Sequence, residues 1–199
     1  RTQWPPGLDR FTGVMGGELV KGRIPLAERI EPGRVVARLT DLGHGNALRE
    51  LFTPDTDGNP VDAEVPPQLA GACLQVLREW DWDERPAAVA WVPGLSRPRL
   101  VAALGEGLAR AGRLQVLGPL GLAPGAAPLP RANSTFRVRD LWTRFHLTPH
   151  QEAVLPGLSG PVLLVDDLVD SRWTMTVAGR LLKRAGARAV LPFALAATG

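Results

Sequence analysis

The sequence predicts an α/β fold: a parallel sheet flanked by helices, with a smaller N-terminal lobe. Two observations predict it. From residue 87 onward, short apolar runs alternate with segments of helical periodicity, and strands that alternate with helices form parallel sheets with right-handed crossovers. One run, Val162–Val165, holds four consecutive apolar residues, which is typical of a strand buried on both faces. We assign residues 1–84 to the lobe and 85–199 to the core.

The lobe is expected to contain few regular elements. Residues 1–18 are rich in Gly and Pro, which favours an irregular lead-in. A strand is predicted at Val35–Leu39 and a short helix at Asn46–Phe52. The polar stretch Pro54–Pro67 contains an Asp-Gly turn signal and is expected to be a loop. Apolar residues recur on one face of Gln68–Trp80, so this segment is predicted to be an amphipathic helix.

The core is expected to contain strands and helices in alternation. Strands are predicted at 87–92, 114–117, 162–165 and 189–195, and helices at 100–111, 135–145 and 174–185. Residues 118–130 are rich in Gly, Pro and Ala and show no periodicity, so they are expected to be a loop. Thr148-Pro149 predicts the start of a further helix, since Pro is favoured at the first helical position.

The most informative stretch is Pro161–Met175. Asp166 and Asp167 come directly after the buried run, and in open α/β sheets ligands bind off the carboxyl ends of the strands. The polar turn Asp170–Thr174 then leads into a helix, whose free N–H groups suit a phosphate. A carboxylate pair suits ribose hydroxyls, directly or through Mg²⁺ that retains its waters. The stretch therefore predicts a site for a sugar and a phosphate.

Leu164–Thr174 resembles the phosphoribosyl-pyrophosphate (PRPP) motif of type I phosphoribosyltransferases: an apolar strand, two acids and a short polar turn that ends in Thr. The resemblance implies that Asp166 and Asp167 bind ribose, with Mg²⁺ and PRPP or a nucleotide as ligands. It also implies a 5′-phosphate loop, made of Asp170, Ser171, Arg172, Trp173 and Thr174. Small residues are expected where Arg172 and Trp173 stand. Arg172 could add charge to a phosphate site, or it could fill the loop.

Gly94, Leu95, Ser96 and Arg97 follow the first core strand, where type I phosphoribosyltransferases carry their pyrophosphate loop. Small residues would let backbone amides approach an anion, and Arg97 or Arg99 would supply charge. The alternative is an ordinary strand–helix turn with a solvated Arg97. The same stretch also resembles the Val-Pro-x-x-x-Arg region of ComF-like competence proteins.

Two further segments have open interpretations. Arg131–Arg144 lies where such enzymes have a mobile hood over PRPP, but it could contact a nucleic-acid backbone or form a solvated helix face. His146 and His150 are not expected to bind a metal, because Pro149 interrupts any helix that would align them and no third ligand is evident.

A broader resemblance covers most of the chain. It rests on the stretches 21–25, 31–43, 82–86, 132–134 and 162–178. These are similar to the C-terminal region of bacterial RecQ-like DNA helicases of the RqlH type, in which a helicase motor and a cysteine zinc module precede a phosphoribosyltransferase-like tail. The resemblance implies an accessory domain of an ATP-dependent 3′-to-5′ DNA helicase, with DNA as the partner of the parent protein. The start at Arg1 rather than Met suits such a tail.

A role in DNA repair and a nucleoid-associated location follow from the same resemblance, whereas a cytoplasmic location is expected from the composition, which includes a single cysteine. Two alternatives stay open. The chain could be an active PRPP-dependent phosphoribosyltransferase, or a ComF-like competence protein without a motor. No Gly-x-x-x-x-Gly-Lys-Ser/Thr sequence occurs, so the chain itself is not expected to hydrolyse ATP.

Composition adds weaker constraints. The net charge is +3, which permits nucleic-acid contact without arguing strongly for it. No apolar run reaches 18 residues, so no membrane span is expected. Cys73 is the only cysteine and can form no disulfide within the chain. Trp80 and Trp91 are expected in the core, and Trp4 and Trp173 are expected to make exposed contacts.

Overall fold

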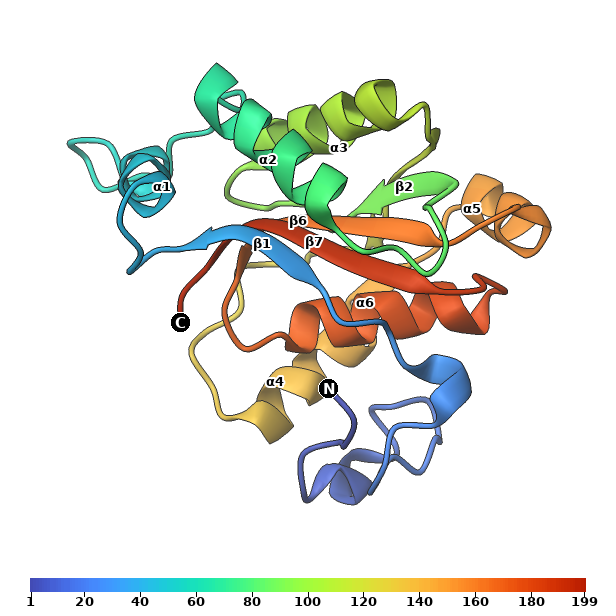
Figure 1. The fold of residues 1–199 in the computed structure, drawn as a ribbon. Helices are drawn as coiled ribbons and strands as arrows, with labels where there is room; N and C mark the ends of the chain where they lie inside the picture. Colours follow the sequence, from blue (N-terminus) through green and yellow to red (C-terminus); the bar gives the residue numbers. More distant parts are fainter.

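The computed structural model describes residues 1–199 and contains a five-stranded parallel sheet with helices on both faces (Figure 1). The sheet order is β1-β7-β6-β2-β3. Its strands are β1 (Arg34–Arg38), β2 (Ala88–Trp91), β3 (Gln115–Pro119), β6 (Val162–Val169) and β7 (Val190–Ala197). The short strands β4 (Gly121–Leu122) and β5 (Phe145–His146) pair separately and antiparallel. The predicted α/β class with a parallel sheet is confirmed.

The helices form a layer on each side of the sheet (Figure 1). One layer contains α1 (His44–Phe52), α2 (Pro67–Glu79) and α3 (Pro98–Gly112), and the other contains α4 (Ser134–Trp142) and α6 (Trp173–Arg184). The short helix α5 (Pro149–Val154) precedes β6, and three 3₁₀ turns lie at Leu8–Phe11, Leu26–Glu28 and Leu155–Gly157. Each layer buries its own apolar cluster against the sheet. None of the helices combines the length and apolar character that a membrane span requires.

Most predicted elements exist, with shifted ends. The largest shift is in β6, which continues four residues past Val165 and includes both acids, because Asp166 to Val169 keep pairing with β7. The helix predicted to reach Phe145 ends at Trp142, and Phe145 lies in β5 instead, where it pairs with Leu122 from the predicted loop. The Thr148 prediction is confirmed: its hydroxyl accepts from the Gln151 N–H, and the Gln151 side chain accepts from the Thr148 N–H.

The first 84 residues contribute one strand to the sheet. β1 is the edge strand beside β7, with Val35 opposite Ala194. Residues 1–30 cross the outer side of α6 and α4 (Figure 1). Arg180 on α6 anchors this segment, because its Nε donates to Glu28 at 2.7 Å and its Nη2 pairs with Glu18. The Arg180 guanidinium also lies 4.1 Å from the ring centre of Trp142.

The structure buries two tryptophans that the sequence predicts to be exposed. Trp80 and Trp91 are buried, as predicted. Trp4 and Trp173, expected to be exposed, are only 7% and 3% accessible. They stack on each other with ring centres 6.1 Å apart, and Trp142 packs edge-on against Trp4. The reason is the path of the N-terminal segment, which covers the start of α6 and removes both rings from water.

Candidate functional site

The loop after β2 and the end of β6 form one pocket of about 290 Å³. β2 and β6 are adjacent in the sheet, with Trp91 opposite Val165, so the segments that follow them meet at the same edge. The pocket, called the acid pocket below, is lined by Gly94, Leu95, Ser96, Arg97, Asp166, Asp167 and Thr174, together with Arg137 and Arg144. A side chain at Gly94 would place its Cβ 2.9 Å from the Arg97 carbonyl oxygen, so the tight turn requires glycine there.

The two acids have different environments. Asp166 is 7% exposed, and its carboxyl group accepts from the Asp167 N–H at 2.9 Å. Burial, and next the nearby Asp167 charge, raise the pKa of Asp166 well above its ordinary value. Asp166 therefore holds a proton at a higher pH than an ordinary aspartate. Asp167 is the more accessible acid, and its carboxylate accepts from the Leu168 N–H at 2.7 Å.

Arg97 lies opposite Asp167. Its Nη1 is 3.8 Å from Asp167 Oδ2, and the two side chains are only 13% and 16% exposed. Its Nη2 donates to the Phe52 carbonyl oxygen at 3.2 Å, and the guanidinium lies over the Phe52 ring. The Nε–H is buried without an acceptor. Arg97 is thus held in the pocket by the end of α1 and is not solvated.

The predicted phosphate loop is divided between two places. Thr174 lines the acid pocket, whereas Arg172 lines a different cavity, beneath β1 and β7. The Asp170 carboxylate accepts from the Thr198 hydroxyl at 2.8 Å, and the ring of Trp173 lies in the core. The extension of β6 to Val169 explains this division, because the turn begins later than the motif implies.

The start of α6 nevertheless keeps free donors. Arg172 is its N-cap residue and provides no side-chain cap. The Trp173 N–H has only a long contact, 3.4 Å, to the Ser171 hydroxyl, and the N–H groups of Thr174 and Met175 donate to no protein acceptor. Such uncapped N–H groups are the backbone donors that bind anions at helix starts.

The segment before β5 contributes two cations to the acid pocket. Arg137 and Arg144 both line it, and Arg144 Nη2 donates to the Ala127 carbonyl oxygen at 2.8 Å. Partial burial, and next the charge of Arg137, lower the pKa of Arg144. Arg139 is directed elsewhere, since it pairs with Asp140 and lies over Phe136.

Sequence reasoning missed Asp62. Its carboxylate accepts from the N–H groups of Arg99 and Leu100 at 3.0 and 2.9 Å, and so occupies the start of α3. Arg99 itself pairs with Glu64 at 3.2 Å. The start of α3 is therefore closed to a phosphate, and Arg97 is the cation that this loop offers. No local pattern marks Asp62, because its partners lie 37 and 38 positions away.

The acids do not fit Mg²⁺ as they stand. Asp166 is buried, and Asp167 faces Arg97, so a divalent cation would first have to displace that guanidinium. No group of three His, Cys, Asp or Glu side chains is arranged to bind a metal ion. By contrast, three arginines and only one accessible carboxylate face the pocket, which favours an anion.

Comparisons with known proteins leave the family open. The chain matches no protein-family model, and no curated protein matches it. The functional conclusion therefore depends on the fold, the acid pocket and the motifs in the sequence.

Proposed function

We propose that the acid pocket binds a phosphorylated ribose compound and that the chain is an accessory domain of a RecQ-like ATP-dependent DNA helicase. The observation that carries the ligand part is that Arg97, Arg137 and Arg144 line one pocket together with Asp166 and Asp167. The helicase part depends on the resemblance described above, with the motor in the same full-length chain and DNA as the partner of that protein.

The phosphate would interact with donors that currently lack acceptors. Arg97 lines the pocket, and a hydrogen bond from its guanidinium to the phosphate would contribute about 1.5–3 kcal/mol. The free N–H group of Thr174, which lines the acid pocket, adds a backbone donor, and the dipole of α6 favours an anion there by about 0.3–1 kcal/mol. A dianionic phosphate matches this set better than a neutral ligand does.

The ribose would interact with the acids. The raised pKa of Asp166 favours its protonated form, which can donate a hydrogen bond, and the Asp167 carboxyl oxygens can accept one, so the pair complements vicinal hydroxyl groups, each of which can do both. This mode requires no metal ion between the protein and the sugar. It also explains why two adjacent acids stand in a pocket that otherwise attracts anions.

A second candidate is an active phosphoribosyltransferase, which the same convergence of loop, acids and Thr174 favours. That activity would require Mg²⁺ and PRPP, and hence release of Asp167 from Arg97. A ComF-like protein would have the same pocket but no helicase motor in its chain.

The ligand is tested by calorimetric titration with ribose 5-phosphate and with PRPP, each with and without Mg²⁺. We expect saturable binding without Mg²⁺, which is lost in Arg97→Gln and retained in Arg99→Gln. Arg99 is the matched control, because it lies two residues away but is exposed and paired with Glu64. If neither compound binds, the proposed ligand is refuted. Mg²⁺-dependent pyrophosphate release from PRPP, lost in Asp167→Asn, would favour the transferase instead.

The helicase part is tested on the full-length gene product. ATP-dependent unwinding of a duplex with a 3′ single-stranded tail is expected. A gene that encodes no motor together with this chain would contradict it and favour the ComF-like alternative.

A further inference from the structure

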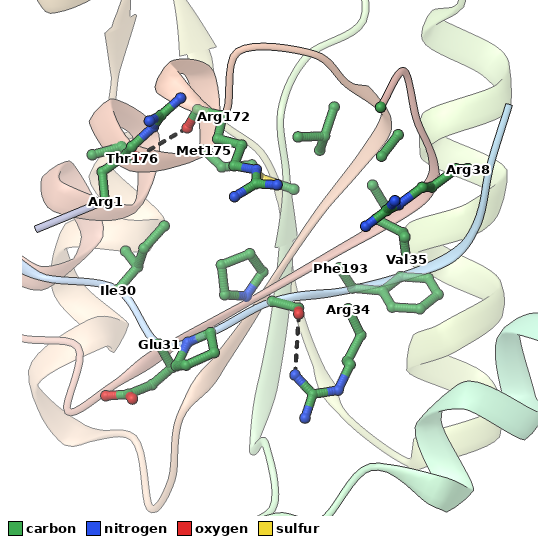
Figure 2. A pocket seen from close by; sticks show the side chains of 17 residues that line it. Arg1, Ile30, Glu31, Arg34, Val35, Arg38, Arg172, Met175, Thr176 and Phe193 are labelled. Atoms are coloured by element: carbon green, nitrogen blue, oxygen red, sulfur yellow. Dashed lines mark hydrogen bonds between the residues drawn. The ribbon is translucent and has the colours of Figure 1, made fainter. Parts of the chain in front are cut away.

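A second cavity of about 380 Å³ lies between β1, β7 and the first turn of α6 (Figure 2). We call it the edge cavity. Val35 and Arg38 of β1, Phe193 of β7, and Arg172 and Met175 of the α6 start define it. None of the residues that line the acid pocket also lines the edge cavity, so the two are separate.

The edge cavity contains two arginines without partners. Four arginines line it, but Arg1 donates to the Ser171 carbonyl oxygen and Arg34 donates to the Gly33 carbonyl oxygen and lies over Trp80. Arg38 and Arg172 form no ion pair, and their guanidinium groups donate no hydrogen bond within the protein. Figure 2 shows both reaching toward the cavity from opposite sides.

One acid, Glu31, also lines the cavity. In Figure 2 its carboxylate points away from Arg38 and Arg172 and therefore does not neutralise them. Among the charged side chains that line the cavity, the two without a partner are therefore both positive.

The backbone at Arg172 is a second, independent observation. Its φ of 67° and ψ of −2° are left-handed, and Arg113 is the only other non-glycine residue with a positive φ. A residue with a Cβ adopts this region at an energetic cost, and such outliers cluster where the conformation serves a site. Here Arg172 lines the edge cavity, although the sequence motif assigns it to the phosphate loop beside the acids.

We propose that the edge cavity binds a nucleoside 5′-monophosphate group. Two guanidinium groups facing one space suit the terminal oxygens of a phosphate monoester, which arginine binds in a bidentate manner. Part of the remaining wall is apolar and includes Pro32, Pro192 and Met175, whose thioether packs well against aromatic rings. The volume is in the range of small-molecule sites, roughly 300–1,000 Å³. The proposal does not depend on the function assigned to the acid pocket.

The test uses the variant Arg97→Gln/Asp167→Asn, in which the acid pocket is disabled. We expect this protein to bind one AMP per chain in calorimetry, with adenosine and inorganic phosphate each binding at least about tenfold more weakly. Adding Arg38→Gln or Arg172→Gly should weaken AMP binding about 10- to 100-fold, the effect of losing a charge-assisted hydrogen bond. Adding Arg110→Gln, an exposed change on α3, should have no effect.

Arg172→Gly removes the cation without a folding penalty, because glycine adopts the left-handed region readily. AMP affinity that is unchanged in both arginine variants would overturn the proposal, and so would adenosine binding as well as AMP. Loss of ribose 5-phosphate binding at the acid pocket would leave these results unaffected, so the two proposals fail separately.

The phosphate monoester could belong to a free nucleotide or to the 5′ end of a nucleic-acid strand. Competition against AMP separates these sources. Displacement by a 5′-phosphorylated oligonucleotide but not by its 5′-hydroxyl counterpart supports the strand end, and displacement by neither supports the free nucleotide. Equal displacement by both would overturn the proposal, because backbone diesters would then be the ligand.

Discussion

Replacing Arg180 with methionine removes the guanidinium that ties residues 18–28 to α6. The Arg180 side chain is 8% exposed and contacts Glu28, itself 17% exposed, as well as Glu18 and Trp142. Breaking a buried ion pair costs about 3–5 kcal/mol, because one charge is left without a partner. Arg184 still lies 3.8 Å from Glu28, and Glu18 is more accessible to water than Glu28. We therefore expect Arg180→Met to lower the free energy of unfolding by about 3 kcal/mol, the lower end of that range.

The assay is urea unfolding followed by tryptophan fluorescence, with Arg188→Met as the matched control. Arg188 pairs with Glu84 at 3.0 Å, but the two side chains are 58% and 43% exposed, so its loss should cost less than about 1 kcal/mol. The thermal midpoint of Arg180→Met should fall by roughly 6–12 °C for a domain of this size. Equal losses in the two variants would refute the view that Arg180 holds the N-terminal segment in place.

Three other predictions concern single residues. Arg172→Gly should raise the free energy of unfolding by about 1 kcal/mol, because glycine relieves the left-handed strain, and urea unfolding that shows a loss would contradict this. Burial raises the pKa of Asp166, so the stability of the wild type relative to Asp166→Asn should be greatest below about pH 4 and should fall as pH rises through the folded-state pKa. A difference in the free energy of unfolding that stays constant between about pH 3 and 9 would argue against it. Burial raises the pKa of Cys73 to about 12, so its thiol should react with a disulfide reagent at pH 8 only after unfolding, and rapid reaction of the native protein would be inconsistent with that environment.

Local patterns predicted the features that depend on local chemistry. The four apolar residues before Asp166 marked the buried strand, and Thr148-Pro149 marked a helix start that the Gln151 capping box completes. That the turn after β2 would serve the same ligand as the two acids was implied only by the resemblance to type I phosphoribosyltransferases. In the structure the two segments line one pocket, because β2 and β6 are neighbours in the sheet.

Features set by distant parts of the chain were not predictable. Trp173 is buried because Trp4 stacks on it from a segment with no periodicity of its own. Asp62 accepts from the first N–H groups of α3, although it lies in a loop whose sequence shows only that it is polar. Arg172 turns away from the acids because β6 stays paired with β7 as far as Val169, a register that no single strand reveals.

A crystal structure of the chain with ribose 5-phosphate would show whether the acid pocket holds a phosphorylated ribose. We expect the sugar hydroxyls within hydrogen-bonding distance of Asp166 and Asp167, and the phosphate in contact with Thr174 and at least one of Arg97, Arg137 and Arg144. Crystals in which the acid pocket stays empty at ligand concentrations that saturate binding in solution would contradict it.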